Sequence, residues 1–409
     1  MKIIVLRPRD SWVIRAGNLF TGKEKSLKQN VLLRLQGGAI EKILPAPAGE
    51  EPEQILVGAG VRRGWKFLDC SKLTVLPGLV DCHVHLALDG VDFQGARQQW
   101  DEPAKTREQV ARRLAQTLAA GVLSVRDGGD RAGVGLLARE MVKNGALPGP
   151  VVAASGCALR KSGMYGSFLG PGVNGDLAGA FRRLAAAGVD QLKVLVSGIV
   201  SFREYGRVGP LQFSPDELNF VVVQAHQAGL KVMAHANSDA AVTIAVRAGV
   251  DSIEHGYLMS RTTLKMLAQQ GVAWVPTIVP VAVQATRSDL FSREQLTVIE
   301  KTYRQQLEAI AEAAELGVTL GVGTDAGSPG VPHGAGYLQE LRLYRRAGLE
   351  PAAILAAATV AGAQIAGAGQ WAGPVEEGRP AGLIAVKRNP LEDLDVLGEI
   401  EYVILPGPE

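Results

Sequence analysis

This sequence contains few cysteines and few histidines, and its net charge is close to zero. The three cysteines (Cys70, Cys82 and Cys157) are odd in number and scattered, which favours reduced thiols in a cytoplasmic protein over a disulfide framework. Lysine and arginine together number 43 and aspartate and glutamate 41, so the net charge is only +2. This balance gives no argument for nucleic acid or an acidic membrane surface as a partner.

Long apolar runs are also missing. None approaches the roughly 18 residues that a membrane-spanning helix needs. The apolar run within the first seven residues is too short for a signal peptide. The sequence therefore predicts a small-molecule partner and no membrane or nucleic acid, and it leaves self-association into a homo-oligomer open.

From Leu76 onward the chain alternates short apolar runs with helical segments. A helix-ending glycine followed at once by a strand-like run recurs at Gly121, Gly188, Gly229, Gly249, Gly271 and Gly317. Candidate strands lie near 76–82, 122–126, 150–154, 190–196, 230–235, 251–254, 272–276 and 319–323. Eight β-α units predict an α/β fold of the (β/α)8 TIM-type barrel kind, whose active face lies at the carboxyl ends of the strands. A doubly wound sheet is the rival, but no G-x-G-x-x-G opens a helix after an early strand.

Both ends of the chain are predicted to be β-structure. Residues 12–16, 31–35 and 40–44 are short strand-like runs near the N-terminus, and 383–386 and 402–405 are similar runs near the C-terminus. A few strands of this size bury little apolar surface alone, so the first group needs partners that the second can supply. At 409 residues the chain has room for a barrel of about 250 residues and an accessory domain.

The chemically active residues fall where these strands end. His83 and His85 are spaced i, i+2 in the first strand, so both imidazoles point to one face and can begin a metal site. His235 ends strand five, His255 ends strand six and Asp325 ends strand eight. Because the chain has only six histidines, this placement favours a metal centre at one end of the barrel.

Lys193 stands inside an apolar strand-like run, where lysine is seldom found without a partner. One interpretation is an ion pair, or a side chain that extends past a short strand into water. The other is that burial lowers the lysine pKa and the neutral amine takes up CO₂. The resulting carbamate is a carboxylate that can bridge two metals.

These motifs resemble the amidohydrolase superfamily in its binuclear form with a carboxylated lysine. The resemblance is carried by residues 77–85, Lys193 with Ser197-Gly198, His235, residues 253–256 and residues 323–327. Within that superfamily the sequence is most similar to the branch that contains prolidase-like Xaa-Pro and related dipeptidases, together with imidazolonepropionase. The resemblance implies a composite β-sandwich built from residues 1–73 and 371–409. The residues between these segments, 74–370, would form the catalytic barrel.

By this resemblance, His83 and His85 would bind one divalent metal ion, His235 and His255 a second, and carboxylated Lys193 would bridge them. The metals are expected to be Zn²⁺. Asp325 would be both a ligand and the catalytic proton shuttle. Two metals lower the pKa of a bridging water and polarise the scissile carbonyl, so a metal-bridging hydroxide would cleave an amide bond of a small molecule such as a dipeptide or N-acyl amino acid.

Five further residues are candidates for contacting substrate. Arg203, Tyr205 and Arg207 follow strand four and could clamp a substrate carboxylate, although a solvated charged loop is the competing interpretation. His333 lies in the loop after strand eight. Tyr165 stands near the place where this branch commonly carries a histidine, and it could donate a hydrogen bond to the developing oxyanion.

Two other hydrolytic functions remain as alternatives on the same scaffold. A phosphotriesterase or lactonase is compatible with the same metal ligands. A mononuclear deaminase usually has a glutamate three residues after the strand-five histidine, and Ser238 at that position counts against it.

Overall fold

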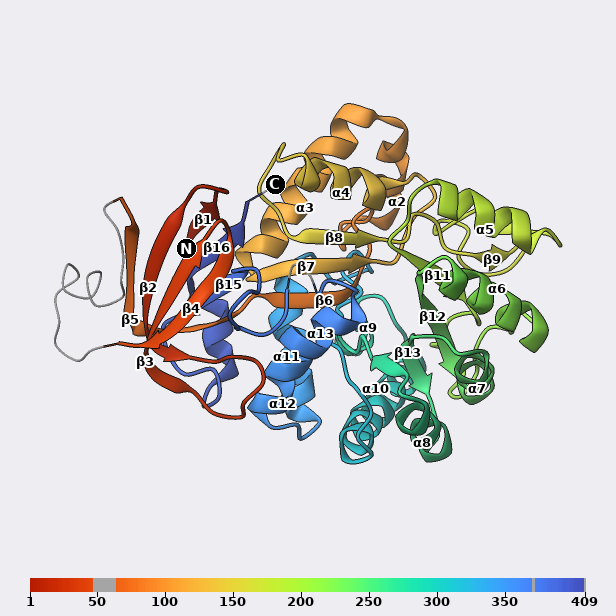
Figure 1. Ribbon diagram of the computed structural model, residues 1–409. Coiled ribbons are helices and arrows are strands. Elements are labelled where there is room, and N and C mark those ends of the chain that lie inside the picture. Colours follow the sequence, from red (N-terminus) through yellow and green to blue (C-terminus); the bar gives the residue numbers. More distant parts are fainter. Residues whose placement is uncertain (47–63, 370–371, 408–409) are drawn as a thin grey trace.

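The computed structural model describes residues 1–46, 64–369 and 372–407 (Figure 1). The strands at the two ends of the chain are β1 (Lys2–Leu6), β2 (Ser11–Leu19), β3 (Lys28–Gln36), β4 (Ala39–Pro45), β5 (Lys66–Pro77), β15 (Leu383–Val386) and β16 (Ile400–Pro406). Those between them are β6 (Leu79–Val84), β7 (Val122–Asp127), β8 (Val151–Ala154), β9 (Arg160–Lys161), β10 (Gly172–Val173), β11 (Gln191–Leu195), β12 (Lys231–Ser238), β13 (Ser252–Leu258) and β14 (Ala273–Val275).

The helices follow the strands of the central region. They are α2 (Phe93–Gln98), α3 (Pro103–Ala119), α4 (Val134–Lys143), α5 (Leu177–Ala186), α6 (Pro215–Gln227), α7 (Asp239–Ala248), α8 (Arg261–Gln270), α9 (Val279–Gln284), α10 (Arg293–Glu315), α11 (Ala335–Arg346), α12 (Pro351–Ala356) and α13 (Gly362–Ile365). Short turns of other helix types are η1 (Gln99–Asp101), η2 (Ala357–Ala361) and η3 (Leu394–Gly398).

Strands from both ends of the chain pair in one seven-stranded sheet, in the order β1-β16-β15-β5-β2-β3-β4. β16 is parallel to β1 and antiparallel to β15, which is antiparallel to β5. Figure 1 shows these red and blue segments side by side, away from the central helices. The expected pairing of the two termini is therefore present, whereas the facing layers of a sandwich stay a prediction.

The predicted domain limits are not tested by this arrangement. β5 runs through the expected boundary at residue 73 and leads through Gly78 directly into β6. The boundary between 370 and 371 lies outside the described residues.

The central strands form two parallel sheets, β6-β7-β8 and β11-β12-β13-β14. Hydrogen bonds link them at both edges. At one edge Leu159 N donates to Lys193 O over 2.8 Å, and at the other the chain near residues 319–326 joins β14 to β6. In that segment Gly321 N donates to Trp274 O at 2.9 Å, and Cys82 N donates to Val322 O at 2.8 Å. Seven of the eight predicted strands are present, whereas the eighth forms only a single bridge at Leu320.

Local sequence signals explain where the helices start and stop. Ser214 caps α6 in a reciprocal capping box with Glu217, and Ser292 with Gln295 does the same for α10. The six glycines predicted to end helices all have φ between +66° and +84°, a conformation that costs glycine little. Most of the apolar residues of these helices and strands share one large core.

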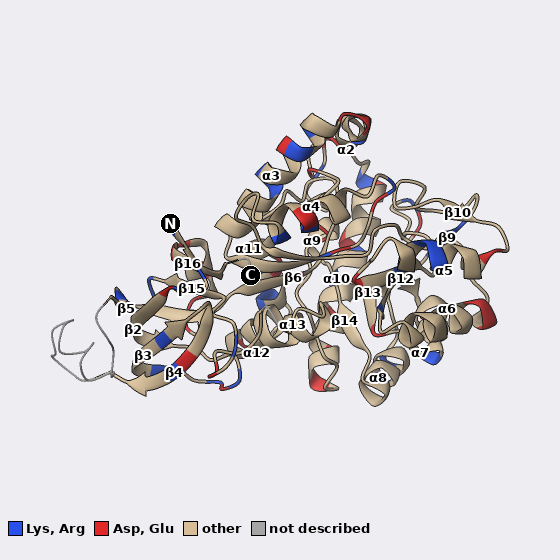
Figure 2. Ribbon diagram, turned by 45° about the horizontal axis from the view of Figure 1, so that its top comes forward, with Lys and Arg blue, Asp and Glu red and all other residues tan. Residues whose placement is uncertain are grey.

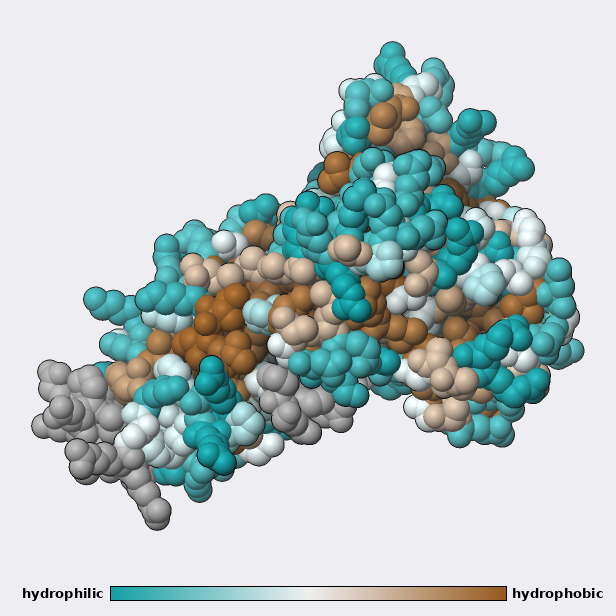
Figure 3. Space-filling view, turned by 90° about the horizontal axis from the view of Figure 1, so that it is seen from above, coloured by the Kyte–Doolittle hydropathy of each residue, from teal (hydrophilic) through white to brown (hydrophobic). Residues whose placement is uncertain are grey.

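Charges of both signs are interspersed along the helices and strands (Figure 2). On the face shown in Figure 3, apolar residues form a band between hydrophilic regions. None of the helices in the described parts of the chain has both the length and the apolar composition required to span a bilayer.

Candidate active site

The six predicted metal ligands converge from five places in the central region. His83 lies next to the last residue of β6 and His85 directly follows the strand. Lys193 lies in β11, His235 in β12 and His255 in β13, and Asp325 follows the segment at 319–323. Lys193 Nζ is 3.3 Å from His83 Nε2, and Asp325 Oδ1 is 3.4 Å from His85 Nε2. The ring centroids of His235 and His255 are 4.5 Å apart. The structure therefore brings together residues that are up to 242 positions apart in the sequence (325 minus 83).

Three of these side chains have the spacing that a metal ion requires. One ligand atom from each of His83, His85 and Asp325 lies within 4.8 Å of the others. Two imidazole nitrogens and a carboxylate oxygen are suitable donors for Zn²⁺ and similar divalent ions. These residues could hold a metal ion, and the chemistry of the donors fits that role.

Hydrogen bonds fix the orientation of the imidazole rings. The Nδ1 atoms of His83, His85 and His255 bond to Glu254 Oε2 at 2.8 Å, Gly129 O at 3.1 Å and Thr277 Oγ1 at 2.6 Å, respectively. In His83 and His85 the other ring nitrogen, Nε2, faces Asp325. A partner on the far nitrogen is the usual way in which proteins orient metal-binding histidines.

Burial sets the charge state of the cluster. Desolvation lowers the pKa of both His85 and His235 to about 3, so these rings are neutral near pH 7 and can donate a lone pair. Desolvation also lowers the pKa of Lys193 to about 8 and raises that of Asp325 to about 7. A carboxyl group with a pKa near the operating pH is suited to exchange protons.

A buried ion pair behind the site was not predicted from the sequence. Arg126 Nη2 donates to Glu254 Oε1 at 2.7 Å, and Ser252 Oγ donates to the same oxygen at 2.6 Å. The other carboxylate oxygen of Glu254 binds His83, so the pair supports a ligand. Arg126 and Glu254 are charged residues inside apolar strands, and a charged residue inside an apolar run is also what made Lys193 a candidate. Applied to Arg126 and Glu254, the same rule would have found them.

The backbone is unusual at three positions of the site. Four of the described non-glycine residues have positive φ, and three of them are His255 at 68°, Thr277 at 48° and Asp325 at 53°. This conformation is uncommon for non-glycine residues and especially unfavourable for β-branched threonine. Such outliers concentrate at functional sites, where the surrounding structure holds them in place.

A cavity of about 490 Å³ opens onto the cluster. Its lining includes His85, Lys193, His235, His255 and Asp325. Tyr165 also lines it, with its ring centroid 5.5 Å from that of His235, as expected for a substrate-contacting residue. The volume is within the range of small-molecule sites, about 300–1,000 Å³.

Four other predicted substrate contacts do not line this cavity. Arg203, Tyr205 and Arg207 are exposed, and Arg207 pairs with Glu204 at 2.9 Å. Phe202, from the same loop, lines the cavity instead. His333 is buried, and its Nε2 bonds to Leu88 O at 2.8 Å, so the structure gives it a loop-supporting position. The expected carboxylate clamp is not formed in this arrangement.

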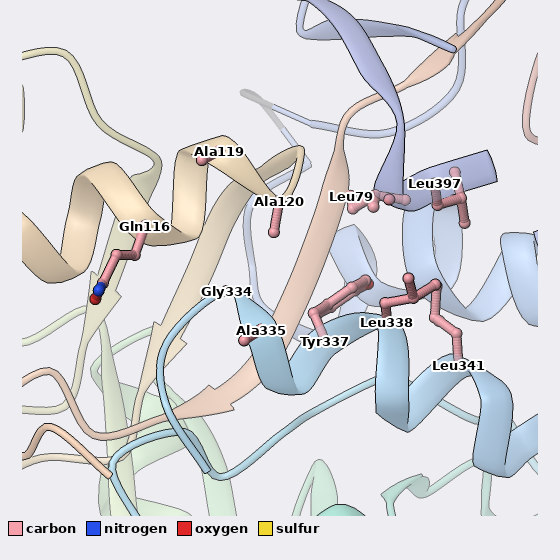
Figure 4. A pocket seen from close by; sticks show the side chains of 11 residues that line it. Leu79, Gln116, Ala119, Ala120, Gly334, Ala335, Tyr337, Leu338, Leu341 and Leu397 are labelled. Atoms are coloured by element: carbon pink, nitrogen blue, oxygen red, sulfur yellow. The ribbon is translucent and has the colours of Figure 1, made fainter. Parts of the chain in front are cut away.

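A second cavity, of about 280 Å³, lies near the end of α3 and the beginning of α11 (Figure 4). Its lining is mainly leucine, alanine and glycine, and Tyr337 in it donates its hydroxyl to Val80 O at 2.8 Å. No carboxylate, imidazole, thiol or amine is among its lining residues, so it offers no groups for catalysis.

Residues 74–407 match the amidohydrolase family, and the chain belongs to that family. The ochratoxinase of Aspergillus niger is 27% identical over 359 residues, which are 80% of this chain and 73% of the relative. A solved Xaa-Pro dipeptidase with bound methionine in the active site is 26% identical, with a TM-score of 0.81, covering 98% of this chain and 99% of that chain. A putative prolidase from Bifidobacterium longum is 25% identical with the same TM-score, covering 98% and 96%.

The family match and these relatives support an enzyme, a hydrolase that acts on carbon–nitrogen bonds. The similarity to the solved structures extends over nearly the whole chain, so it includes the sheet formed by the two termini.

Proposed function

We propose that this protein is a metal-dependent hydrolase that cleaves the amide bond of a small molecule. The observation that carries the proposal is the convergence of His83, His85, Lys193 and Asp325 at a cavity of substrate size. We infer that the central strands form a (β/α)8 barrel, which the hydrogen bonds at both sheet edges support. The three free thiols support a cytoplasmic location.

We expect two divalent metal ions, which would be Zn²⁺, and the spacing of His83, His85 and Asp325 supports the first of them. His83, His85 and Asp325 would hold one, and His235 and His255 the other, with a carbamate on Lys193 between them. When bound, such ions polarise a carbonyl oxygen and lower the pKa of a bound water. The carbamate is supported by the surroundings of Lys193, because this buried amine forms no ion pair with any described carboxylate. A buried ammonium without an ionic partner is unfavourable, whereas a carboxylated amine would face four imidazoles.

The chain's own residues supply positioning and proton transfer. Asp325 Oδ1 faces the imidazoles of His83 and His85, where it can take the proton of the attacking water and deliver it to the leaving nitrogen. Tyr165, whose ring lies beside that of His235, would donate a hydrogen bond to the carbonyl oxygen as negative charge develops on it. Glu254, Gly129 and Thr277 hold three imidazoles so that these rings need not reorganise.

Deamination has less support. Ser238, at the position where deaminases usually carry a glutamate, accepts a hydrogen bond from Ala241 N at 3.2 Å and caps α7. It is occupied in helix capping and carries no carboxyl group that could move a proton.

A combined metal and substrate analysis tests the proposal. Purified protein should contain two divalent ions per chain, and chelation should abolish turnover until metal is restored. It should hydrolyse amides of small molecules faster than lactones or aryl phosphotriesters of similar size. Faster turnover of lactones or phosphotriesters would replace the amide assignment, and full activity after complete metal removal would contradict the metal mechanism.

A further inference from the structure

The lining of the cavity includes two aromatic groups that are distant in sequence. In the first group the rings of Phe93 and Phe168 are 5.1 Å apart, and those of Phe168 and Tyr165 are 6.1 Å apart. In the second group Phe202 and Phe291 meet edge to face at 5.7 Å. All five residues line the cavity, so the space next to the metal ligands is bounded by ring surfaces.

Charged groups in the cavity are confined to the ligand cluster. Lys193 and Asp325 are the only Lys, Arg, Asp or Glu side chains among its lining residues, and both belong to the ligand cluster. A substrate carboxylate or ammonium group would therefore lose its hydration in the cavity without gaining an ionic partner outside the catalytic residues. Transfer of a charge under those conditions is strongly unfavourable.

Apolar residues continue to the outer part of the cavity. Ile199 and Leu290 line it while remaining 52% and 59% exposed. Large aliphatic side chains at a cavity edge gain nothing from water, but they gain when an apolar ligand group covers them.

We propose that the preferred substrate is a neutral amide that carries an aromatic ring, and that a zwitterionic dipeptide is a poor substrate. This inference rests on the proposed function and specifies the substrate class of the same site. The ring packs between the wall of Phe93, Phe168 and Tyr165 and the wall of Phe202 and Phe291, while the amide carbonyl lies at the ligand cluster. The bond that breaks is the amide C–N bond, water supplies the hydroxyl of the acid product, and the amine leaves with the proton.

Matched amides test this substrate class. N-methylacetamide is the reference, and phenylacetyl-methylamide and acetyl-benzylamide place the ring on the acyl and the amine side. At least one aromatic amide should exceed the reference in kcat/KM by about ten- to a hundredfold, the factor expected for burying one ring. A para-carboxylate on that ring should lower kcat/KM at least tenfold relative to a para-carboxamide. Equal turnover of all three amides, or a preference for the carboxylate, would overturn the inference.

Variants locate the ring within the cavity. Phe168→Leu and Phe291→Leu keep an apolar side chain and so protect folding, but they remove one aromatic surface each. At least one should lower the ratio of aromatic to reference kcat/KM several-fold. Phe220→Ala is the matched control, because Phe220 is 39% exposed on α6 and does not line the cavity, and it should keep the ratio. An unchanged ratio in both leucine variants would contradict the proposed walls.

A binding measurement separates this inference from the proposed function. N-benzyl methanesulfonamide and N-methyl methanesulfonamide resist hydrolysis, and calorimetry with the metal-loaded enzyme gives their affinities. If no amide is hydrolysed but the benzyl compound binds at least tenfold more tightly, the proposed function fails and the aromatic site stands. If amides are hydrolysed and the two sulfonamides bind equally, the aromatic site fails and the proposed function stands.

Discussion

Lys193→Met tests the central residue of the site, because methionine is of similar length but cannot be charged or carboxylated. In the wild-type chain without metal, burial lowers the Lys193 pKa from 10.5 to about 8. At about 1.4 kcal/mol for each pKa unit, keeping this lysine protonated in the folded state costs about 3 kcal/mol. We therefore expect metal-free Lys193→Met to be more stable than metal-free wild type at pH 7, by up to that amount.

The pH dependence follows from the same shift. The folded-state pKa is below the unfolded value, so the unfolded chain binds more protons between about pH 8 and 10.5. The stability of the metal-free wild type should rise across that interval relative to the variant, and the difference should close as pH approaches 10.5. Urea denaturation of both metal-stripped proteins at pH 7 and pH 10 measures this, and Lys265→Met, at an exposed lysine on α8, is the control.

Metal content and carbamate detection complete the experiment. Lys193→Met should bind fewer than two metals and lose turnover, and Lys193→Ala should be partly rescued by short carboxylic acids. Wild type prepared in ¹³C-bicarbonate should give a carbamate carbon signal in NMR spectra that both variants lack. A metal-free Lys193→Met less stable than metal-free wild type at pH 7 would refute the burial argument. Two bound metals and wild-type turnover in that variant would refute the carbamate.

Three further predictions concern Asp325 and the buried charged residues Arg126 and Glu340. Asp325→Asn should lower kcat at least about 10²-fold in variant protein that still binds metal, and normal turnover there would assign proton transfer elsewhere. Arg126→Met leaves Glu254 buried without its ionic partner, so urea denaturation should show a loss of about 3–5 kcal/mol, whereas breaking the exposed Arg304–Glu300 pair should cost less than about 1 kcal/mol. Burial raises the pKa of Glu340 to about 8, above its ordinary 4.5, so its contribution to stability is complete below pH 4.5 and is lost as pH rises through 8. Glu340→Gln should flatten that decline in metal-free protein, and an unchanged pH profile would contradict the shift.

The convergence of the six predicted metal ligands could be predicted from the sequence because its signal is local. Two histidines spaced i, i+2 in a strand must share a face, and strand exits of parallel units must meet at one edge. The signal for the helix-ending glycines is equally local, and all six of these glycines have the positive φ that the prediction required. That the ligands bind metal stays a prediction, but their convergence could be read from periodicity alone.

Long-range partners could not be predicted in this way. The partner of His83 Nδ1 is Glu254, 171 residues away, and no periodicity links two such positions. The predicted substrate contacts in the loop after β11 do not line the cavity for a related reason. A position near a strand exit does not determine which side chains turn inward. Phe202 lines the cavity, whereas its neighbour Arg203 is exposed.

The shared sheet of the two termini has a consequence for how the protein is made. β1 and β5 are separated in the sheet by β15 and β16, which are synthesised more than 300 residues after them. During synthesis the edge of β5 formed by Thr74–Pro77 stays without its partner Leu383–Val386 for more than 300 residues, although the β6 strand that follows it carries His83, the first predicted metal ligand. Contacts of such sequence separation form slowly, and unpaired edges meanwhile invite aggregation. Newly made chains should therefore depend on chaperones until β16 emerges, and truncation before Leu383 should yield aggregates even though every predicted site residue is present.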